Sequence, residues 1–154
     1  MTYAAGTSVS VSRSRIELEE LLQKWKADRI ASGIEPGSAV IAFSMGRWHV
    51  RFKMPLPTAA DAAKQKNHRG YYLGPGDQAR WLDQHHRERW RALLLTVKAK
   101  LVSVENGVES FEEAFLAHLV LPGGETVGQR ALPAINEAYT TGRMPPLLPA
   151  GDAR

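Results

Sequence analysis

Basic side chains at alternating positions are the clearest sign of chemistry in this sequence. Residues 47–54 alternate strictly between basic and apolar side chains. Alternate side chains of a β-strand point to opposite faces, so this segment predicts a strand with one cationic and one apolar face. Like charges on one face repel one another, and the phosphates of a polyanion would relieve that repulsion. The cationic positions are Arg47, His49, Arg51 and Lys53, and the apolar positions are Trp48, Val50, Phe52 and Met54.

A cationic row of this kind has a second interpretation. Natural sheets often carry lysine and arginine on an edge strand, where the charges prevent the edge from pairing with another chain. The charge pattern alone supports both a nucleic-acid-binding face and a protected edge.

A basic segment with paired tyrosines follows the predicted strand. Residues 58–76 show no sustained hydrophobic period, which predicts a long mobile loop with at most one short helical turn. Cationic side chains that hold phosphates, next to aromatic rings that stack on bases, are typical of proteins that bind single strands. The alternative is a solvated loop whose tyrosine rings pack against the core. The residues concerned are Lys64, Lys66, His68, Arg69, Tyr71 and Tyr72.

The third basic group lies on a predicted helix that spans residues 77–106. Its four cations each fall within about 20° of a common direction at ~100° per residue, beside the apolar face rather than opposite to it. Such a stripe could contact phosphates, and it is also typical of a solvated amphipathic helix. Trp81 lies outside the apolar register and could stack on a base or fill a subunit interface. The four cations are Arg80, Arg87, Arg91 and Lys98.

No set of residues in the sequence has the pattern of a catalytic or metal site. The chain contains no cysteine, no glycine-rich phosphate loop and no nucleophile motif of a known enzyme class. His85 and His86 are adjacent, so on a helix they point about 100° apart and cannot share a metal ion as an i, i+4 pair would. His118 lies on or near an apolar helix face, where a structural histidine is expected. We therefore expect no enzymatic activity, no metal and no cofactor.

A helix and a β-hairpin should position the basic strand. Ser14-Arg-Ile-Glu17 fits a capping box that begins a helix, and Gly33 with Pro36-Gly37 predicts the end of that helix. The apolar run 39–43 and a tight turn at Met45-Gly46 then lead into the alternating segment. These two segments predict a β-hairpin with one buried face.

Helical periodicity predicts that most of the remaining chain is helical. Capping boxes and glycine stops set the ends of these helices, and a proline interrupts or restarts the last of them. The predicted elements are a helix over 77–106 that stops at Asn106-Gly107, a helix from the capping box Ser110–Glu113, a helix over 126–141 broken at Pro133 and stopped by Gly142, and an extended, proline-rich tail over 144–149.

Together these elements predict an α+β fold: a β-hairpin, or small antiparallel sheet, packed on a long amphipathic helix, with N-terminal and C-terminal helices. We expect a single domain over residues 1–154, with a loose tail or short edge strand over residues 1–11. The net charge of +4 permits anionic partners without requiring them. No apolar run approaches the roughly 20 residues of a membrane span, and the first residues lack the features of a signal peptide. We therefore expect a cytoplasmic protein with no membrane partner.

Three stretches of the chain resemble small proteins encoded by bacteriophages and integrated elements: Arg89–Leu101, Phe111–Pro122 and Met144–Pro149. This resemblance carries no site residues. The combination of a basic hairpin, a basic loop and a long packing helix is also similar to the core of Rad52-like single-strand annealing proteins, which phages often encode. The resemblance implies binding of single-stranded DNA, self-association, and the host cytoplasm as the location.

These observations predict a nucleic-acid-binding protein that favours single-stranded DNA and acts in phage-type recombination or annealing. We also expect a homo-oligomer in which Trp81 or the tail Pro145–Pro149 meets a neighbouring subunit. The alternative is a small phage protein that binds and inhibits a host protein, with its basic face on an acidic surface and the tail as an anchor. In the first hypothesis the phosphates would lie on Arg47, Arg51 and Lys53, with Lys64, Lys66 and Arg69 closing over the strand and Tyr71 or Tyr72 stacking on a base.

Overall fold

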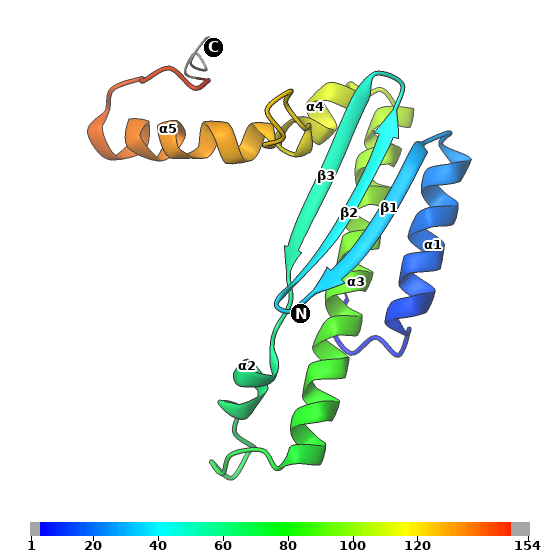
Figure 1. Ribbon diagram of the computed structural model, residues 1–154, viewed down its shortest axis with the longest axis vertical. Coiled ribbons are helices and arrows are strands. Elements are labelled where there is room, and N and C mark those ends of the chain that lie inside the picture. Colours follow the sequence, from blue (N-terminus) through cyan, green and yellow to red (C-terminus); the bar gives the residue numbers. More distant parts are fainter. Residues whose placement is uncertain (1–3, 149–154) are drawn as a thin grey trace.

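Three antiparallel strands form one sheet in the order β1-β2-β3, and the two longest helices that pack on it lie on the same face (Figure 1). The structure is a computed structural model and describes residues 4–148. It confirms the predicted α+β fold, with a small antiparallel sheet, a long helix and helices near both ends. The elements are α1 (Val11–Lys24), β1 (Asp28–Glu35), β2 (Ser38–Met45), β3 (Trp48–Pro55), α2 (Ala59–Ala63), α3 (Pro75–Glu105), α4 (Phe111–Phe115), the short 3-10 helix η1 (Leu116–His118) and α5 (Val127–Thr141).

The predicted β-hairpin is formed by β2 and β3. The strands pair from Ser38 opposite Pro55 to Met45 opposite Trp48. Gly46 has a φ of 57°, the positive value that a two-residue hairpin turn requires and that glycine adopts without strain. Arg47 is the second residue of this turn and lies outside β3, although the sequence predicted a strand that begins at this residue.

The strand β1 corrects the prediction for the segment before the hairpin. The sequence predicted a helix that continues towards Gly33, whereas α1 ends at Lys24 and residues 28–35 form the outer strand of the sheet. Residues 31–33 are small and have low strand propensity, so nothing in their periodicity indicates a strand. Pairing with β2 holds them in the sheet. The chain reverses between α1 and β1 at Lys26, which has a positive φ, and Arg29 has a positive φ where the pairing of β1 is irregular between Asp28 and Ala31.

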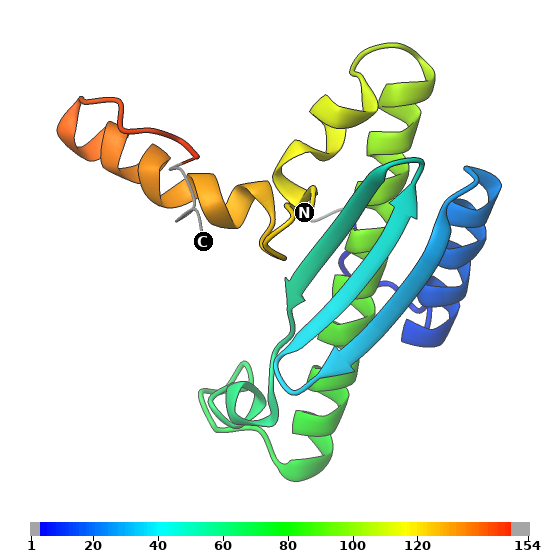
Figure 2. The ribbon, with the colours of Figure 1, turned by 45° about the horizontal axis from the view of Figure 1, so that its top comes forward.

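The core lies between the sheet and the layer formed by α1 and α3 (Figure 2). Val50 and Phe52 of β3 are buried against this layer, as the alternating pattern predicted. The predicted register of α3 is also confirmed, because Trp90, Leu93 and Val97 are all buried. Within residues 4–148, no helix covers the opposite face of the sheet (Figures 1 and 2). The side chains of β3 that alternate with the buried ones lie on this open face.

The start of α1 differs from the prediction by one turn. Ser10 rather than Ser14 is the N-cap residue, and its hydroxyl accepts a hydrogen bond from the backbone N–H of Arg13. Ser14 is fully buried inside the helix. Glu17, which would have completed the predicted capping box, pairs instead with Arg13 and Arg91.

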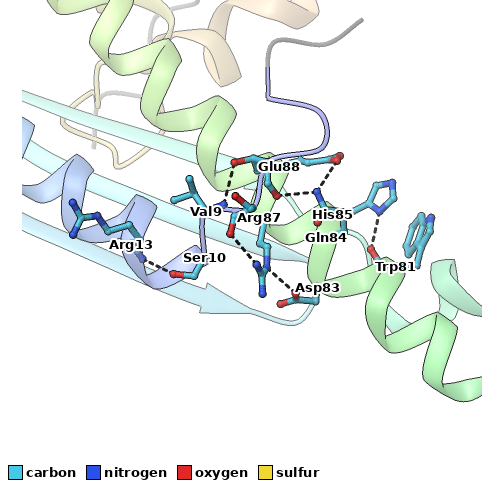
Figure 3. A network of polar contacts seen from close by, with 11 residues as sticks. Val9, Ser10, Arg13, Trp81, Asp83, Gln84, His85, Arg87 and Glu88 are labelled. Atoms are coloured by element: carbon cyan, nitrogen blue, oxygen red, sulfur yellow. Dashed lines mark hydrogen bonds and ion pairs between the residues drawn. The ribbon is translucent and has the colours of Figure 1, made fainter.

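Residues 4–10 were expected as part of a loose tail or an edge strand, but they form no strand and are hydrogen-bonded to α3. The Glu88 carboxylate accepts from the backbone N–H of Gly6, while Gln84 and Arg87 donate to the carbonyls of Thr7 and Ser8. Figure 3 shows these α3 side chains gathered beside the segment that leads into α1. Residues 1–3 of the expected tail lie outside the described residues.

The C-terminal helices follow their predicted signals with one correction. The capping box of Ser110 and Glu113 is formed, and Gly142 ends α5 in the left-handed conformation. The helix α5 is continuous through Pro133, although the sequence predicted a break there. Pro133 is exposed, so water can satisfy the carbonyl that loses its intrahelical partner. The helix α5 extends away from the sheet and contacts η1 (Figures 1 and 2).

Candidate nucleic-acid interface

Arg47 and His49 of the predicted cationic row have partners within the protein. The guanidinium carbon of Arg47 lies 4.6 Å from the ring centroid of Trp48. The Nδ1 atom of His49 lies 2.8 Å from the hydroxyl of Ser44 on the neighbouring strand, which makes a hydrogen bond across the sheet. These contacts fix both side chains near the β2-β3 turn.

Arg51 and Lys53 occupy the other half of the row and differ from one another. The Nη2 atom of Arg51 donates to the carbonyl of Gly124 at 2.6 Å and to Oε1 of Gln129 at 3.2 Å. Arg51 is half-buried and ties the start of α5 to the sheet. Lys53 is exposed, and within the described part of the chain its side chain makes no hydrogen bond or ion pair.

The chain after α4 wraps around the outer edge of β3. The backbone N–H of Val120 donates to the carbonyl of His49 at 2.8 Å, and Leu119 forms an isolated bridge with Val50. His118 stacks on Phe52 on the helical side, with ring centroids 3.8 Å apart. Because this half of the edge is covered by the chain itself, it does not depend on charge for protection.

Burial and the nearby Lys100 cation lower the pKa of His118, and a hydrogen bond with the main chain of Arg51 acts in the opposite direction. The neutral form of the imidazole is therefore favoured at neutral pH. This agrees with the structural role predicted for His118.

The basic segment 64–72 forms a hydrogen-bonded loop with a defined path, preceded by the short helix α2. Lys66 and Tyr72 form a β-bridge, and the N–H of Asn67 donates to the carbonyl of Tyr71 at 2.8 Å. The side-chain oxygen of Asn67 accepts from the backbone N–H groups of Arg69 and Tyr71, which closes the turn. The loop lies beyond the end of β3, next to the start of α3 (Figure 1).

Two adjacent tyrosine rings are exposed on this loop. Tyr71 is 71% exposed and Tyr72 is 66% exposed, so the alternative that both rings pack against the core is wrong. The ammonium of Lys66 lies 4.8 Å from the ring centroid of Tyr72. Lys64 and Arg69 are exposed in the same segment. The loop therefore presents aromatic faces and cations together.

The cationic stripe of α3 is largely neutralised by carboxylates. Arg80 pairs with Asp77, and Arg87 pairs with Asp83 at 2.7 Å. Arg91 reaches across to Glu17 of α1 at 2.7 Å and lowers the pKa of that carboxyl, with a further contribution from Arg13. Lys98 is exposed and has no ion-pair partner among the described residues.

The two histidines of α3 and Trp81 also have partners within the protein. Trp81 stacks on His85, with ring centroids 4.0 Å apart, and His85 Nδ1 lies 2.7 Å from the carbonyl of Trp81 (Figure 3). His86 turns the other way and bonds the carbonyl of Pro57. Among residues 4–148, no group of three or more metal-binding side chains is placed to hold an ion.

A cavity of about 470 Å³ opens between the Lys53 end of β3, η1 and the start of α5. Arg51 and Lys53 line it together with His118, Thr126 and Gln129. Sequence reasoning did not identify the last two, because they lie more than 70 residues beyond the strand. The only sequence signal was the capping box that Thr126 forms with Gln129, which marks a helix start and nothing more.

No family model, no curated protein and no solved structure matches this chain. Within the described residues, no helix has the length and apolar character that a membrane span requires.

Proposed function

We propose that this protein binds single-stranded nucleic acid, with single-stranded DNA as the favoured ligand, through the loop 64–72 and the adjoining end of β3. The observation that carries the proposal is the exposure of Tyr71 and Tyr72 side by side in a loop that also carries Lys64, Lys66 and Arg69. Burying an aromatic ring is favourable, so two exposed rings at one place are more informative than two buried ones. Exposed rings offer platforms on which unstacked bases lie.

The charges around the rings support the same function. Lys64, Lys66 and Arg69 stand beside the tyrosines, and Lys53 is free at the end of the strand that leads to the loop. Lys64 lies close enough to the Asp61 carboxylate to help lower its pKa, whereas Lys53, Lys66 and Arg69 have no carboxylate partner among the described residues. Cations without such a partner can each neutralise a phosphate and release its counterion. A duplex shields its bases in the stack, so this combination favours a single strand.

Titration of a labelled single-stranded oligonucleotide and of the matching duplex across a salt series tests the proposal. We expect tighter binding of the single strand, with an affinity that falls as salt rises. Absence of binding at low salt would overturn the proposal. Equal affinity for the two forms would remove the role of the tyrosines as base platforms.

A second candidate function is protein binding, and the apolar surface of α5 and residues 143–148 favours it. Tyr139 is 90% exposed, and Leu132 and Met144 are also exposed. The partner would be a second copy, as an annealing assembly requires, or a host protein that the chain inhibits. Sedimentation at tens of micromolar tests the first partner, because a monomer with and without oligonucleotide would exclude self-association. The end of the predicted anchor, from Pro149 onward, lies outside the described residues.

A further inference from the structure

The cavity beside Lys53 has the size and the chemistry of a ligand site. Its volume of about 470 Å³ lies within the range of roughly 300–1,000 Å³ that is common for small-molecule sites. Ser38 and Thr126 are buried at its base, while Lys53, Pro55 and Leu132 are exposed at its rim. The cavity is therefore a hollow that a ligand can enter from solvent.

The walls of the cavity come from elements that are held tightly together. Arg51 ties β3 to Gly124 and Gln129 at the start of α5. The helix α5 approaches η1 so closely at Gly128 that an added Cβ would lie 2.9 Å from the carbonyl oxygen of Ala117. The hollow is thus part of the fold and does not require a ligand to form it.

Two cations stand at one side of the cavity. Lys53 has no partner among the described residues, so its ammonium is available to an anion. Among residues 4–148, the hydrogen bonds of the Arg51 side chain all run through Nη2, which leaves the N–H groups of its other guanidinium nitrogens for a ligand. A phosphate group would fit between them, because both side chains bind phosphate oxygens well.

The edge of β3 adds hydrogen-bonding groups. In an antiparallel strand the backbone groups of every second residue face the same side. The carbonyl of His49 faces outward to Val120, so the N–H and C=O of Lys53 also face outward, where the cavity lies. No partner outside the sheet takes them up within the described residues. A free N–H beside a free C=O matches the donor and acceptor pattern on the edge of a nucleobase.

The remaining surface suits the flat, apolar face of a base. Leu132 is 54% exposed and lines the cavity together with Pro55 and Ala117. The surface that lines the hollow is mostly apolar, and covering it together with the exposed Leu132 by the face of a ring is favourable.

We propose that this cavity binds one unstacked nucleotide of a single strand, with the base inside the hollow and its phosphate on Lys53 and Arg51. The inference rests on the proposed function and specifies its ligand: the loop tyrosines would stack on bases, and the cavity would accept one base that has left the stack. A duplex cannot supply such a base without opening a pair.

The experiment compares thymidine and adenosine monophosphates with inorganic phosphate, by NMR titration of the full chain. We expect the mononucleotides to bind more tightly than phosphate, by about 5- to 150-fold if the base contributes one stacking contact. Equal affinity for mononucleotide and phosphate would reduce the cavity to an anion site and overturn the base-binding claim.

A pair of matched variants locates the binding. Leu132→Glu places a carboxylate at the rim of the cavity, and Thr140→Glu places the same charge on the same helix at an exposed residue that does not line the cavity. We expect Leu132→Glu to weaken mononucleotide binding at least about tenfold, since it repels the phosphate and removes an apolar contact. Thr140→Glu should stay close to the parent chain. Equal effects of the two variants would show that the cavity is not the site.

An oligonucleotide with one abasic position separates this inference from the proposed function. The cavity claim fails and the proposed function stands under one set of results: the parent chain binds the oligonucleotide, it does not bind mononucleotides, and the loss of one base leaves its affinity for the oligonucleotide unchanged. If mononucleotides bind in the cavity but no oligonucleotide binds, the proposed function fails and the cavity claim stands.

Discussion

On α3, Arg80, Arg87 and Arg91 each have a carboxylate within ion-pair distance, whereas the cations of the loop 64–72 stand beside two exposed aromatic rings. In the sequence both groups read as basic patches of similar density. In the structure Arg91 joins α3 to Glu17 of α1. Arg87 joins α3 to the segment that leads into α1 (Figure 3). The loop group has no comparable structural task, apart from the contact of Lys66 with Tyr72.

This difference shows that the contribution of a basic residue to phosphate binding cannot be judged without knowing its partners within the protein. A phosphate that binds Arg91 must first displace Glu17 and would lose the contact between two helices. A phosphate that binds Arg69 displaces only water. If the proposed function is correct, equal changes in charge at the two places should therefore have unequal effects.

Charge reversal at matched positions should give the largest effect. Lys64→Glu with Arg69→Glu changes two exposed loop cations, and Arg89→Glu with Lys98→Glu makes the same change in net charge on exposed α3 positions. Each reversal replaces an attraction of about 1 kcal/mol by a repulsion of similar size. We expect the loop variant to bind single-stranded DNA about 30- to 1,000-fold more weakly at low salt.

The α3 variant should lose only the general attraction that follows net charge, measured in the same fluorescence titration. Equal losses in the two variants would contradict the comparison, because binding would then depend on total charge and not on the loop. Circular dichroism of both variants checks that the fold is kept.

Removal of the aromatic rings should give the next largest effect. Tyr72→Ala removes one exposed ring, and base stacking contributes roughly 1–3 kcal/mol for each ring. We expect a loss of about 5- to 150-fold in affinity for a single strand. Tyr72→Phe keeps the ring and should bind like the parent chain. Tyr139→Ala removes a ring that is 90% exposed on α5 and is the matched control. A similar loss in Tyr139→Ala would argue that ring removal acts indirectly.

Local hydrophobic periodicity in the sequence was sufficient to predict the elements that bury one face. The alternation of β3 and the three-to-four spacing on α3 identified Phe52, Trp90 and Val97 as core residues, since each repeat has one period and one face. Capping signals also worked where only one reading existed, as at Ser110 and Gly142. At the start of α1 the capping box predicted at Ser14 was wrong: Ser10 is the N-cap residue, and Glu17 forms ion pairs with Arg13 and Arg91.

The remaining features depend on contacts that are distant in the sequence. The strand β1 is held by pairing with β2 and not by its own side chains, so its small residues carried no signal. The partners of Arg51 lie at Gly124 and Gln129, and nothing near Arg51 in the sequence points to them. Tyr71 and Tyr72 are exposed at the turn that Asn67 closes. The sequence alone left open whether these rings are available to a ligand or pack against the core.

A smaller effect should appear in the salt dependence. Lys53→Gln removes a cation with no partner in the described chain, and Arg89→Gln removes an exposed cation of α3. If Lys53 neutralises one phosphate, its loss should lower the slope of log affinity against log salt by about 0.7 for a single strand. Arg89→Gln should leave the slope unchanged. A slope that is unchanged in Lys53→Gln would place the phosphates elsewhere and confine the interface to the loop.

The smallest effect concerns stability and tests the structural side of the comparison. Arg91 and then Arg13 hold the pKa of Glu17 below its ordinary value of 4.5. The unfolded chain therefore binds a proton at a higher pH than the folded chain does. The stabilisation from this pair is present above pH 4.5 and is lost as the pH falls through the lowered pKa of the folded protein.

Glu17→Gln removes the charge and keeps the shape of the side chain. Both partners are partly exposed, so we expect a loss of about 0.5–1 kcal/mol in the free energy of unfolding at pH 7, measured by urea denaturation. The difference between parent and variant should shrink as the pH falls through the lowered pKa of Glu17 in the folded protein, because the parent then loses the same charge by protonation. DNA affinity at pH 7 should not change. If the variant keeps its stability but binds DNA with a different affinity, the structural role assigned to the α3 cations is wrong. These cations would then contact the ligand instead of stabilising the fold.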